Sequence, residues 1–248
     1  MLPALANVRI VLVHTSHPGN IGATARAMMN MGLGELVLVA PKRFPDPEAT
    51  GRAASAASLL ETARVVEDLD QALSGCTLVV GTSARERRIP WPLLEARSCA
   101  RRMVAEAATS PVALLFGRED RGLTNEELMR CQLHVTIPTN PDYSSLNLAM
   151  AVQVLAYELR VAALGEDVAD LMAGWDQPLA TAADVERFLA HLETTLIAIG
   201  FLRPDVPKQL MTRLRRLFAR TRLDSMEVSI LRGILTAMDQ SLARRDAP

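Results

Sequence analysis

Over the first two thirds of the chain, short apolar runs alternate with longer amphipathic segments, and this alternation constrains the fold more than any other feature. Leu36–Ala40 and Val112–Phe116 are examples of the apolar runs, and both are rich in branched side chains. Buried strands that alternate with helices form a parallel sheet with helices on both of its faces. We therefore expect an α/β domain over residues 1–165.

The pattern predicts individual elements within this domain. Strands are expected at Val8–His14, Leu36–Ala40, Ala63–Val66, Leu78–Thr82, Val112–Phe116 and His134–Ile137. Helices are expected at Ile21–Met31, in part of Pro47–Leu60, and at Leu69–Leu73, Leu93–Ala108, Thr124–Arg130 and Leu146–Leu164, from apolar residues at helical spacing. Thr124 followed by two acids is typical of a helix N-terminus.

The pattern changes near Gly165. Residues 166–182 contain Gly174, Trp175 and Pro178 and are predicted to be a linker. Beyond it the chain shows only helical spacing, over Ala183–Ile199, Pro207–Arg220 and Ser225–Leu242. We expect a small all-α domain over residues 183–248, near the lower size limit for independent folding.

Composition excludes several classes of protein. The chain has 248 residues, 49% of them hydrophobic, and a net charge of -1, which excludes global disorder. No apolar run approaches the roughly 20 residues of a membrane helix, and the start MLPALANVRIVLV lacks the basic region of a signal peptide. Three widely spaced cysteines fit a reducing cytoplasm. His14 and His17 have no partners that would complete a zinc site, so no metal is expected.

Basic residues gather in two places although the chain is nearly neutral. One cluster, between Val206 and Leu223, contains no acid and comprises Lys208, Arg213, Arg215, Arg216, Arg220 and Arg222. The other comprises Arg85, Arg87 and Arg88. Such clusters attract phosphate backbones, and a solvated helix face is an equally good interpretation from charge alone.

Polar residues follow three of the predicted strands. In Thr15–Gly32, Gly19 and Gly22 are expected to form a tight turn that offers backbone N–H groups to an anion. A complete dinucleotide fingerprint would need a third glycine. Asn20 and Arg26 could face one ligand; alternatively, Asn20 caps the helix and Arg26 forms a surface ion pair.

The other two segments also begin where a strand ends. Leu114–Leu123 places four consecutive charged residues at the carboxyl end of a buried strand, where parallel sheets bind ligands, although a salt-bridged loop is the alternative. In Ile137–Leu159, Ser144 or Ser145 could cap the following helix. Asn147 is expected on an apolar helix face, where it needs a hydrogen-bonding reason.

Together with the GTSAR turn at 81–85, these segments closely resemble the SPOUT class of RNA methyltransferases, in its 2′-O-ribose-methylating, TrmH-like branch. HPGNIGATARAMMNMG, FGREDRGLTNEEL and PDYSSLNLAMAVQVLAYE resemble the three family motifs. The match is best to the bacterial TrmJ-type tRNA (cytidine/uridine-2′-O-)-methyltransferases. The segments RLRRLFAR and ILRGIL resemble the helical extension of that subfamily. The resemblance implies a SPOUT domain over 1–165 with a deep trefoil knot at roughly 112–160, a tRNA-binding helical domain, and a homodimer with its active site at the subunit interface.

The resemblance also assigns residues. It implies an S-adenosylmethionine site made of Thr82, Ser83, Ala84, Gly117, Ile137, Ser144, Ser145 and Leu146. Gly117 would let the backbone approach the adenosine, and Ile137 and Leu146 would form apolar walls. The matching catalytic set is Asn20, Arg26, Glu119, Ser145 and Asn147, with Glu119 orienting Arg26 or Asn20. RNA would be held by Arg26, Arg85, Arg87, Arg88, Lys208, Arg213, Arg215, Arg216 and Arg220.

Further expectations concern the substrate and the assembly. The expected target is the cytidine or uridine at position 32 of the tRNA anticodon loop, with Arg26 holding the adjacent phosphate. Trp91 and Tyr143 could stack on an unpaired base, and core packing is the alternative for Trp91. Met28, Met29, Met31 and the last helix of the domain are either a dimer surface or core.

Other functions remain open from the sequence. A SPOUT enzyme could methylate the ribose of another RNA, a base, or ribosomal RNA, and a SPOUT protein could bind RNA without catalysis. A nucleotide- or NAD-linked α/β enzyme is disfavoured by the missing glycine of the fingerprint.

Overall fold

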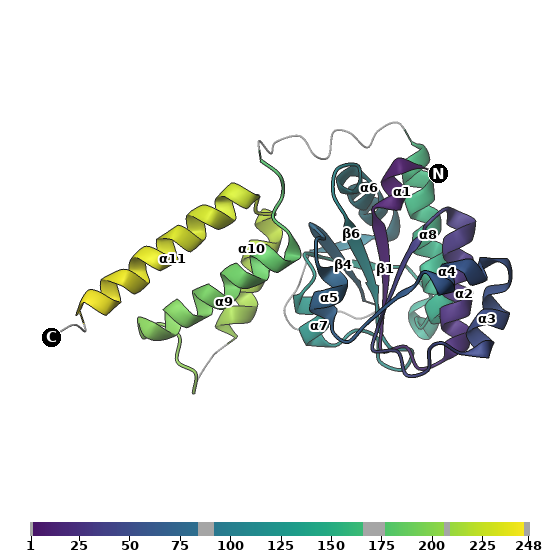
Figure 1. The fold of residues 1–248 in the computed structure, drawn as a ribbon, viewed down its shortest axis with the longest axis horizontal. Helices are drawn as coiled ribbons and strands as arrows, with labels where there is room; N and C mark the ends of the chain where they lie inside the picture. Colours follow the sequence, from purple (N-terminus) through teal and green to yellow (C-terminus); the bar gives the residue numbers. More distant parts are fainter. Residues whose placement is uncertain (1, 84–91, 166–176, 206–208, 246–248) are drawn as a thin grey trace. The chain divides into compact units, whose positions relative to one another are not determined.

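A computed structural model of the chain describes residues 2–83, 92–165, 177–205 and 209–245 (Figure 1). The chain forms two compact units, residues 1–173 and 174–248. The predicted linker at 166–182 falls largely outside the described residues.

The first unit contains a parallel sheet, as predicted, but the sheet has seven strands where six were expected. Its strands are β1 (Val8–Val13), β2 (Glu35–Val39), β3 (Arg64–Val66), β4 (Leu78–Thr82), β5 (Leu93–Glu95), β6 (Val112–Phe116) and β7 (Leu133–Thr136). They lie in the order β3-β2-β1-β6-β4-β7-β5, and each neighbouring pair is parallel. From β1 the connections lead to β2 and β3 on one side of the sheet, whereas from β6 they lead to β7 on the other side. In open α/β sheets, ligands bind at the point where the order of the strands reverses in this way.

Helices flank the sheet. They are α1 (Pro3–Ala6), α2 (Pro18–Met31), α3 (Pro47–Ala53), α4 (Ala57–Glu61), α5 (Leu69–Leu73), α6 (Ala96–Ala107), α7 (Asn125–Met129) and α8 (Leu148–Leu164), with short 3-10 turns at Ala54–Ala56 and Pro141–Tyr143. Figure 1 shows α2, α3 and α8 on one side of the sheet and α5 and α7 on the other. The predicted covering of both faces is confirmed.

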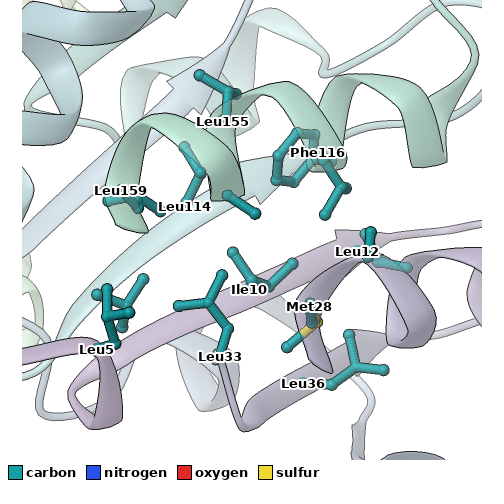
Figure 2. Close-up of a cluster of buried hydrophobic side chains, with 14 of the residues drawn as sticks. Leu5, Ile10, Leu12, Met28, Leu33, Leu36, Leu114, Phe116, Leu155 and Leu159 are labelled. Carbon is teal, nitrogen blue, oxygen red and sulfur yellow. The ribbon is translucent and has the colours of Figure 1, made fainter. Parts of the chain in front are cut away.

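A continuous apolar core lies between the sheet and the helices α2 and α8 (Figure 2). Ile10 of β1, Leu114 of β6, Leu155 of α8 and Met28 of α2 are all buried in it. Burial of this kind contributes about 1.5–3 kcal/mol per large apolar side chain. For Met28 the core interpretation is therefore correct, whereas Met29 is exposed.

One prediction about the elements was wrong, and one helix was missed. Leu93–Glu95 was expected to open a helix but forms the edge strand β5, paired with β7 from His134 to Thr136. In the sequence, the helical spacing of α6 extends back over these residues, and a strand of three residues is too short to show an alternation of its own. Helix α1 was not predicted, and its four residues are too few for a periodic signal.

The glycines of the first motif have a different role from the one expected. Gly19 and Gly22 lie inside α2, which begins at Pro18, and do not form a turn. A Cβ atom on Gly22 would fall 2.0 Å from the backbone oxygen of Ala49 in α3. The missing side chain therefore lets α2 and α3 pack in close contact.

The described residues of the second unit, 177–205 and 209–245, form three helices and a short bridge. The helices are α9 (Ala182–Ala198), α10 (Leu210–Thr221) and α11 (Ser225–Arg245), and Leu179, which precedes α9, pairs with Asp224, which precedes α11. Its core is small and includes Phe188, Leu189 and Leu235, with Phe188 packed edge-on against Phe218 at 4.8 Å. Across the described parts of both units, no helix is long and apolar enough to span a membrane.

Candidate active site at the carboxyl edge of the sheet

A pocket opens at the carboxyl ends of β4, β6 and β7. It is lined by Thr82, Ser83, residues 116–123, Val135, Ile137, Thr139, Ser144, Ser145, Leu146, Leu148 and Ala151. Every residue expected to bind the cofactor lines this pocket, except Ala84, which lies outside the described residues. The GTSAR turn and the second and third motifs, distant in sequence, therefore contribute to one concave site, whereas no residue of the first motif lines it.

The pocket has apolar walls and a loop that is held by hydrogen bonds. Phe116, Ile137 and Leu146 contribute apolar surface. The Thr82 hydroxyl donates to the Leu115 carbonyl at 2.9 Å, and the Thr139 hydroxyl donates to the Ser144 carbonyl at 3.3 Å. Apolar faces beside backbone and hydroxyl groups suit a nucleoside, whose flat base needs both.

Gly117 has a structural reason of its own. A Cβ atom at this position would lie 2.0 Å from the carbonyl carbon of Gly122 and 2.1 Å from the backbone nitrogen of Leu123. The loop folds back on itself because Arg118 and Gly122 exchange backbone hydrogen bonds of 3.2 and 2.8 Å. Only glycine lets the chain turn so tightly here, and Gly122 adds a positive φ of 70°.

Glu119 is the centre of a hydrogen-bonded network. Its carboxylate accepts from the Ser16 backbone N–H at 3.1 Å, the Ser16 hydroxyl at 2.8 Å, the His17 backbone N–H at 3.1 Å and the Asn20 side-chain amide at 3.0 Å. Partial burial opposes ionisation, but these donors outweigh it and lower the pKa of Glu119 to about 2. Glu119 is therefore a fixed carboxylate and not a proton carrier near neutral pH.

The network continues to Asn147. The Asn147 side-chain amide donates to Asn20 Oδ1 at 3.0 Å, and Asn147 Oδ1 accepts from the backbone nitrogens of Ala149 at 2.9 Å and Met150 at 3.4 Å. Asn147 is the N-cap of α8, so it does not lie on a helix face, and neither Ser144 nor Ser145 caps the helix. Its polar side chain serves the helix end, as asparagine commonly does.

This arrangement fixes the direction of both side-chain amides. A carboxylate only accepts hydrogen bonds, so Asn20 must turn its NH₂ group to Glu119 and its oxygen to Asn147. Each amide nitrogen carries two hydrogens and uses one of them in the network. In the described part of the chain, the second N–H of Asn20 and of Asn147 remains available to a ligand.

Arg26 lies apart from this network. It is exposed on α2, does not line the pocket, and has no hydrogen bond or ion pair with any residue that the structure describes. Glu119 was expected to orient either Arg26 or Asn20. It binds Asn20 and makes no hydrogen bond or ion pair with Arg26 in the described part of the chain. The surface ion pair considered for Arg26 is absent from the described ranges.

Sequence reasoning missed several residues of the site. Ser16 and the backbone of His17 hold Glu119, and Arg118 binds both carboxylate oxygens of Glu127 at 3.0 Å. Glu127 also completes the capping box at Thr124, which begins α7 as predicted. The available signal was the position of Ser16 in the segment that follows the end of β1 at Val13, because the carboxyl ends of parallel strands meet at one edge.

The expected RNA-binding arginines are placed unevenly. Arg85, Arg87, Arg88 and Lys208, together with Trp91, lie outside the described residues. Arg213 and Arg220 are exposed on α10, whereas Arg215 pairs with Glu186 of α9 and Arg216 is half-buried. Tyr143 is 80% exposed at the pocket loop. Among the described residues, no cluster of His, Cys, Asp and Glu could hold a metal ion.

The chain is similar to known proteins along nearly its whole length. Residues 7–157 match the SpoU rRNA Methylase family, and residues 183–247 match the tRNA methyltransferase TrmJ, C-terminal domain. It is 55% identical over 237 residues to the tRNA (cytidine/uridine-2′-O-)-methyltransferase TrmJ of Escherichia coli K12, covering 95% of this chain and 96% of that protein.

Solved structures agree with the sequence match. The crystal structure of TrmJ from Z. mobilis ZM4 matches with a TM-score of 0.81 and 33% identity, over 93% of this chain and 98% of that one. A structure described as giving insights into the 2-OH methylation of C/U34 on tRNA matches with a TM-score of 0.51 and 28% identity, over 64% and 97%.

Proposed function

The chain belongs to the SpoU rRNA Methylase family, and from this premise we propose that it methylates the ribose 2′ oxygen of a cytidine or uridine in tRNA, with S-adenosylmethionine as methyl donor. The observation that carries the proposal is that the pocket and the polar network share a residue, Glu119. Glu119 lines the pocket and binds Asn20, which binds Asn147. The relatives named above carry the same activity in their names.

The pocket residues fit the proposed methyl donor. Ile137 and Leu146 would cover the adenine faces, and backbone groups beside Ser83 and Gly117 would meet its polar edge. Ser144 and Ser145, exposed on the adjoining loop, would close the pocket. When bound, S-adenosylmethionine supplies a methyl group that its sulfonium already activates, so the chain's residues have chiefly to align the attacking oxygen.

The residues of the network perform this alignment. The free N–H groups of Asn20 and Asn147 would donate to the ribose and fix its 2′ oxygen at the pocket mouth. Arg26 would hold the phosphate beside that ribose, since guanidinium groups match phosphate geometry. The hydroxyl proton would leave to the phosphate or to water, because a guanidinium group only donates hydrogen bonds and Glu119 already accepts four of them.

Exposed apolar side chains support a homodimer. Met150, Val154, Tyr157, Val161 and Leu164 recur on α8 at helical spacing, and all five are exposed. An exposed apolar stripe of this extent marks an interaction surface. Met29 of the adjacent α2 is also exposed, one turn from Arg26. Pairing of two copies here would bring Arg26 to the subunit interface and complete the active site there.

Three finer points belong to the proposal. We infer a trefoil knot over residues 112–160, which the position of β4 between β6 and β7 supports. The helical domain at 183–248 would bind tRNA through Arg213 and Arg220. The target would be position 32 of the anticodon loop, with position 34, at which the more distant relative is described, as the alternative.

The test is methyl transfer from labelled S-adenosylmethionine to an unmodified tRNA pool, followed by nuclease digestion. Label in an alkali-resistant dinucleotide from the anticodon loop, reduced about 1,000-fold by Arg26→Ala with cofactor binding intact, is the expected result. Label on a base or only on ribosomal RNA would overturn the substrate. An Arg26→Ala enzyme with near-normal turnover would overturn the assigned role, and tRNA binding without transfer would indicate a non-catalytic protein.

A further inference from the structure

Three exposed cations lie beside the catalytic network and outside the three motifs. Lys42 and Arg43 follow β2, and Arg52 lies in the last turn of α3. We call them the basic cluster.

Two contacts place the basic cluster next to the segment that carries Ser16 and Asn20. The backbone nitrogen of Lys42 donates to the Thr15 carbonyl at 3.0 Å. The Cγ atom of Arg52 lies 3.6 Å from the Cβ position of Gly19. Figure 1 shows α2 and α3 side by side, as this contact requires. Lys42 and Arg52 therefore each lie next to the segment that leads into the N-terminus of α2.

The sheet order places the basic cluster opposite the pocket. The pocket lies at the carboxyl ends of β6, β4 and β7, whereas the cluster follows β2, on the other side of β1. Glu119 and Asn20 bridge the ends of β6 and β1, between the two. A ribose held by the network would thus have the methyl donor on one side and the basic cluster on the other.

The charges of the basic cluster are available to an anion. Lys42 and Arg52 have no ion pair with any residue of the described ranges. Arg43 pairs with Asp46 at 2.8 Å, but the Arg43 side chain is 63% exposed, and a surface pair of this kind contributes little. Asp46 is also engaged as the N-cap of α3. Glu48 is the acid that remains beside these cations.

We propose that Lys42, Arg43 and Arg52 bind the RNA phosphate backbone that continues from the target nucleotide on the β2 side of the active site. The inference rests on the proposed function and names the surface by which that site holds its substrate. Phosphate contacts of this kind fix the register of a nucleic acid and do not read its sequence. The basic cluster would orient the anticodon loop so that the target ribose reaches Asn20 and Asn147.

The experiment compares matched charge reversals in the full-length protein. R52E is set against R101E, which reverses another exposed arginine, on α6, that does not line the pocket. We expect K42E/R52E to weaken tRNA binding about tenfold and to reduce the slope of log K against log salt by about 2, with R101E close to wild type. E48Q removes the remaining acid and should strengthen binding. S-adenosylmethionine binding should be unchanged in all variants, which confirms that the first domain is folded.

The outcomes separate this inference from the proposed function. Equal losses of tRNA affinity in R52E and R101E would overturn the proposed role of the basic cluster. Unchanged tRNA binding by a K42E/R52E enzyme that still methylates tRNA would do the same. Either result would leave the proposed activity unaffected. If the wild-type protein binds tRNA but methylates none, the activity fails, and the ranking of K42E/R52E, R101E and E48Q still decides the inference. K42Q/R52Q, which only neutralises the charges, should lower the salt slope by the same amount of about 2 and weaken tRNA binding less than K42E/R52E does.

Discussion

The two units of the chain hold their candidate residues in opposite ways. In the first unit, Glu119, Asn20 and Asn147 come from three distant segments and bind one another, with Glu119 accepting four hydrogen bonds. In the second unit, Arg213 and Arg220 stand exposed on one helix, and neither has an ion pair with any described residue.

This contrast indicates which property each unit contributes to the proposed reaction. A reacting oxygen must be placed within a fraction of an ångström, so its contacts need side chains that are themselves fixed. Attraction of a phosphate backbone needs positive charge at roughly the right place and tolerates mobile side chains. We therefore expect substitutions in the first unit to lower the rate steeply and those in the second to lower affinity gradually.

After Arg26→Ala, the largest effect is expected for Glu119→Gln, which keeps the shape of the side chain. A glutamine offers one acceptor oxygen, and its NH₂ group would face the N–H donors of Ser16 or His17. The orientation of Asn20 would be lost, and we expect the single-turnover rate of tRNA methylation to fall about 100-fold. Glu126→Gln, an exposed carboxylate on α7 outside the pocket, is the control. Equal rates for the two variants would contradict a geometric role for Glu119.

The same variant carries a pH signature. The pKa of Glu119 is lowered from 4.5 to about 2, so its carboxylate stabilises the folded state fully above pH 4.5 and loses this contribution as the pH falls toward 2. Glutamine does not titrate. The gap in free energy of unfolding between wild type and Glu119→Gln should therefore narrow between pH 4.5 and pH 2 in urea denaturation. A gap that stays constant over this range would exclude the carboxylate as its origin.

A smaller effect, on stability, is expected for Gly117→Ala. The new methyl group would overlap the backbone of Gly122 and Leu123, which cannot move as a flexible side chain can. Overpacking of this kind costs about 1–3 kcal/mol, and the pocket loop should lose affinity for S-adenosylmethionine. Gly51→Ala in α3 is the matched control, because nothing lies within 4 Å of its Cβ position, and it should be neutral or stabilising by about 0.5–1 kcal/mol. Denaturation curves that rank the two variants in the reverse order would contradict the tight packing at Gly117.

The sequence predicted which segments meet but not how their side chains bind. Strand patterns were sufficient to place polar residues after β1 and β6 at one edge, because parallel strands end together. The role of Asn147 could not be predicted, since a helix start shifted by two residues changes a face position into an N-cap. Nor could the reason for Gly22, which depends on how closely α3 approaches α2. Periodicity reports burial within one element and is silent about contacts between elements.

The second unit shows the same limit in its charges. The sequence from Val206 to Leu223 contains no acid, yet Glu186 of α9 neutralises Arg215. Arg222, counted in the same cluster, is buried. Only the exposed members of the cluster can meet a phosphate at little cost, and the fold determines which these are.

The smallest effect is expected for the double variant Arg213→Glu and Arg220→Glu. Both side chains are exposed on α10, so the substitution should leave the core around Phe188 intact. If each arginine contacts one phosphate, the KM for tRNA should rise about fivefold and kcat should change little. The slope of log K for tRNA binding against log salt should fall by about 2. Arg232→Glu on α11, another exposed arginine of the same unit, is the matched control. A fall in kcat as steep as that of Glu119→Gln would mean that the helical unit also positions the reacting ribose, and the contrast between the two units would then fail.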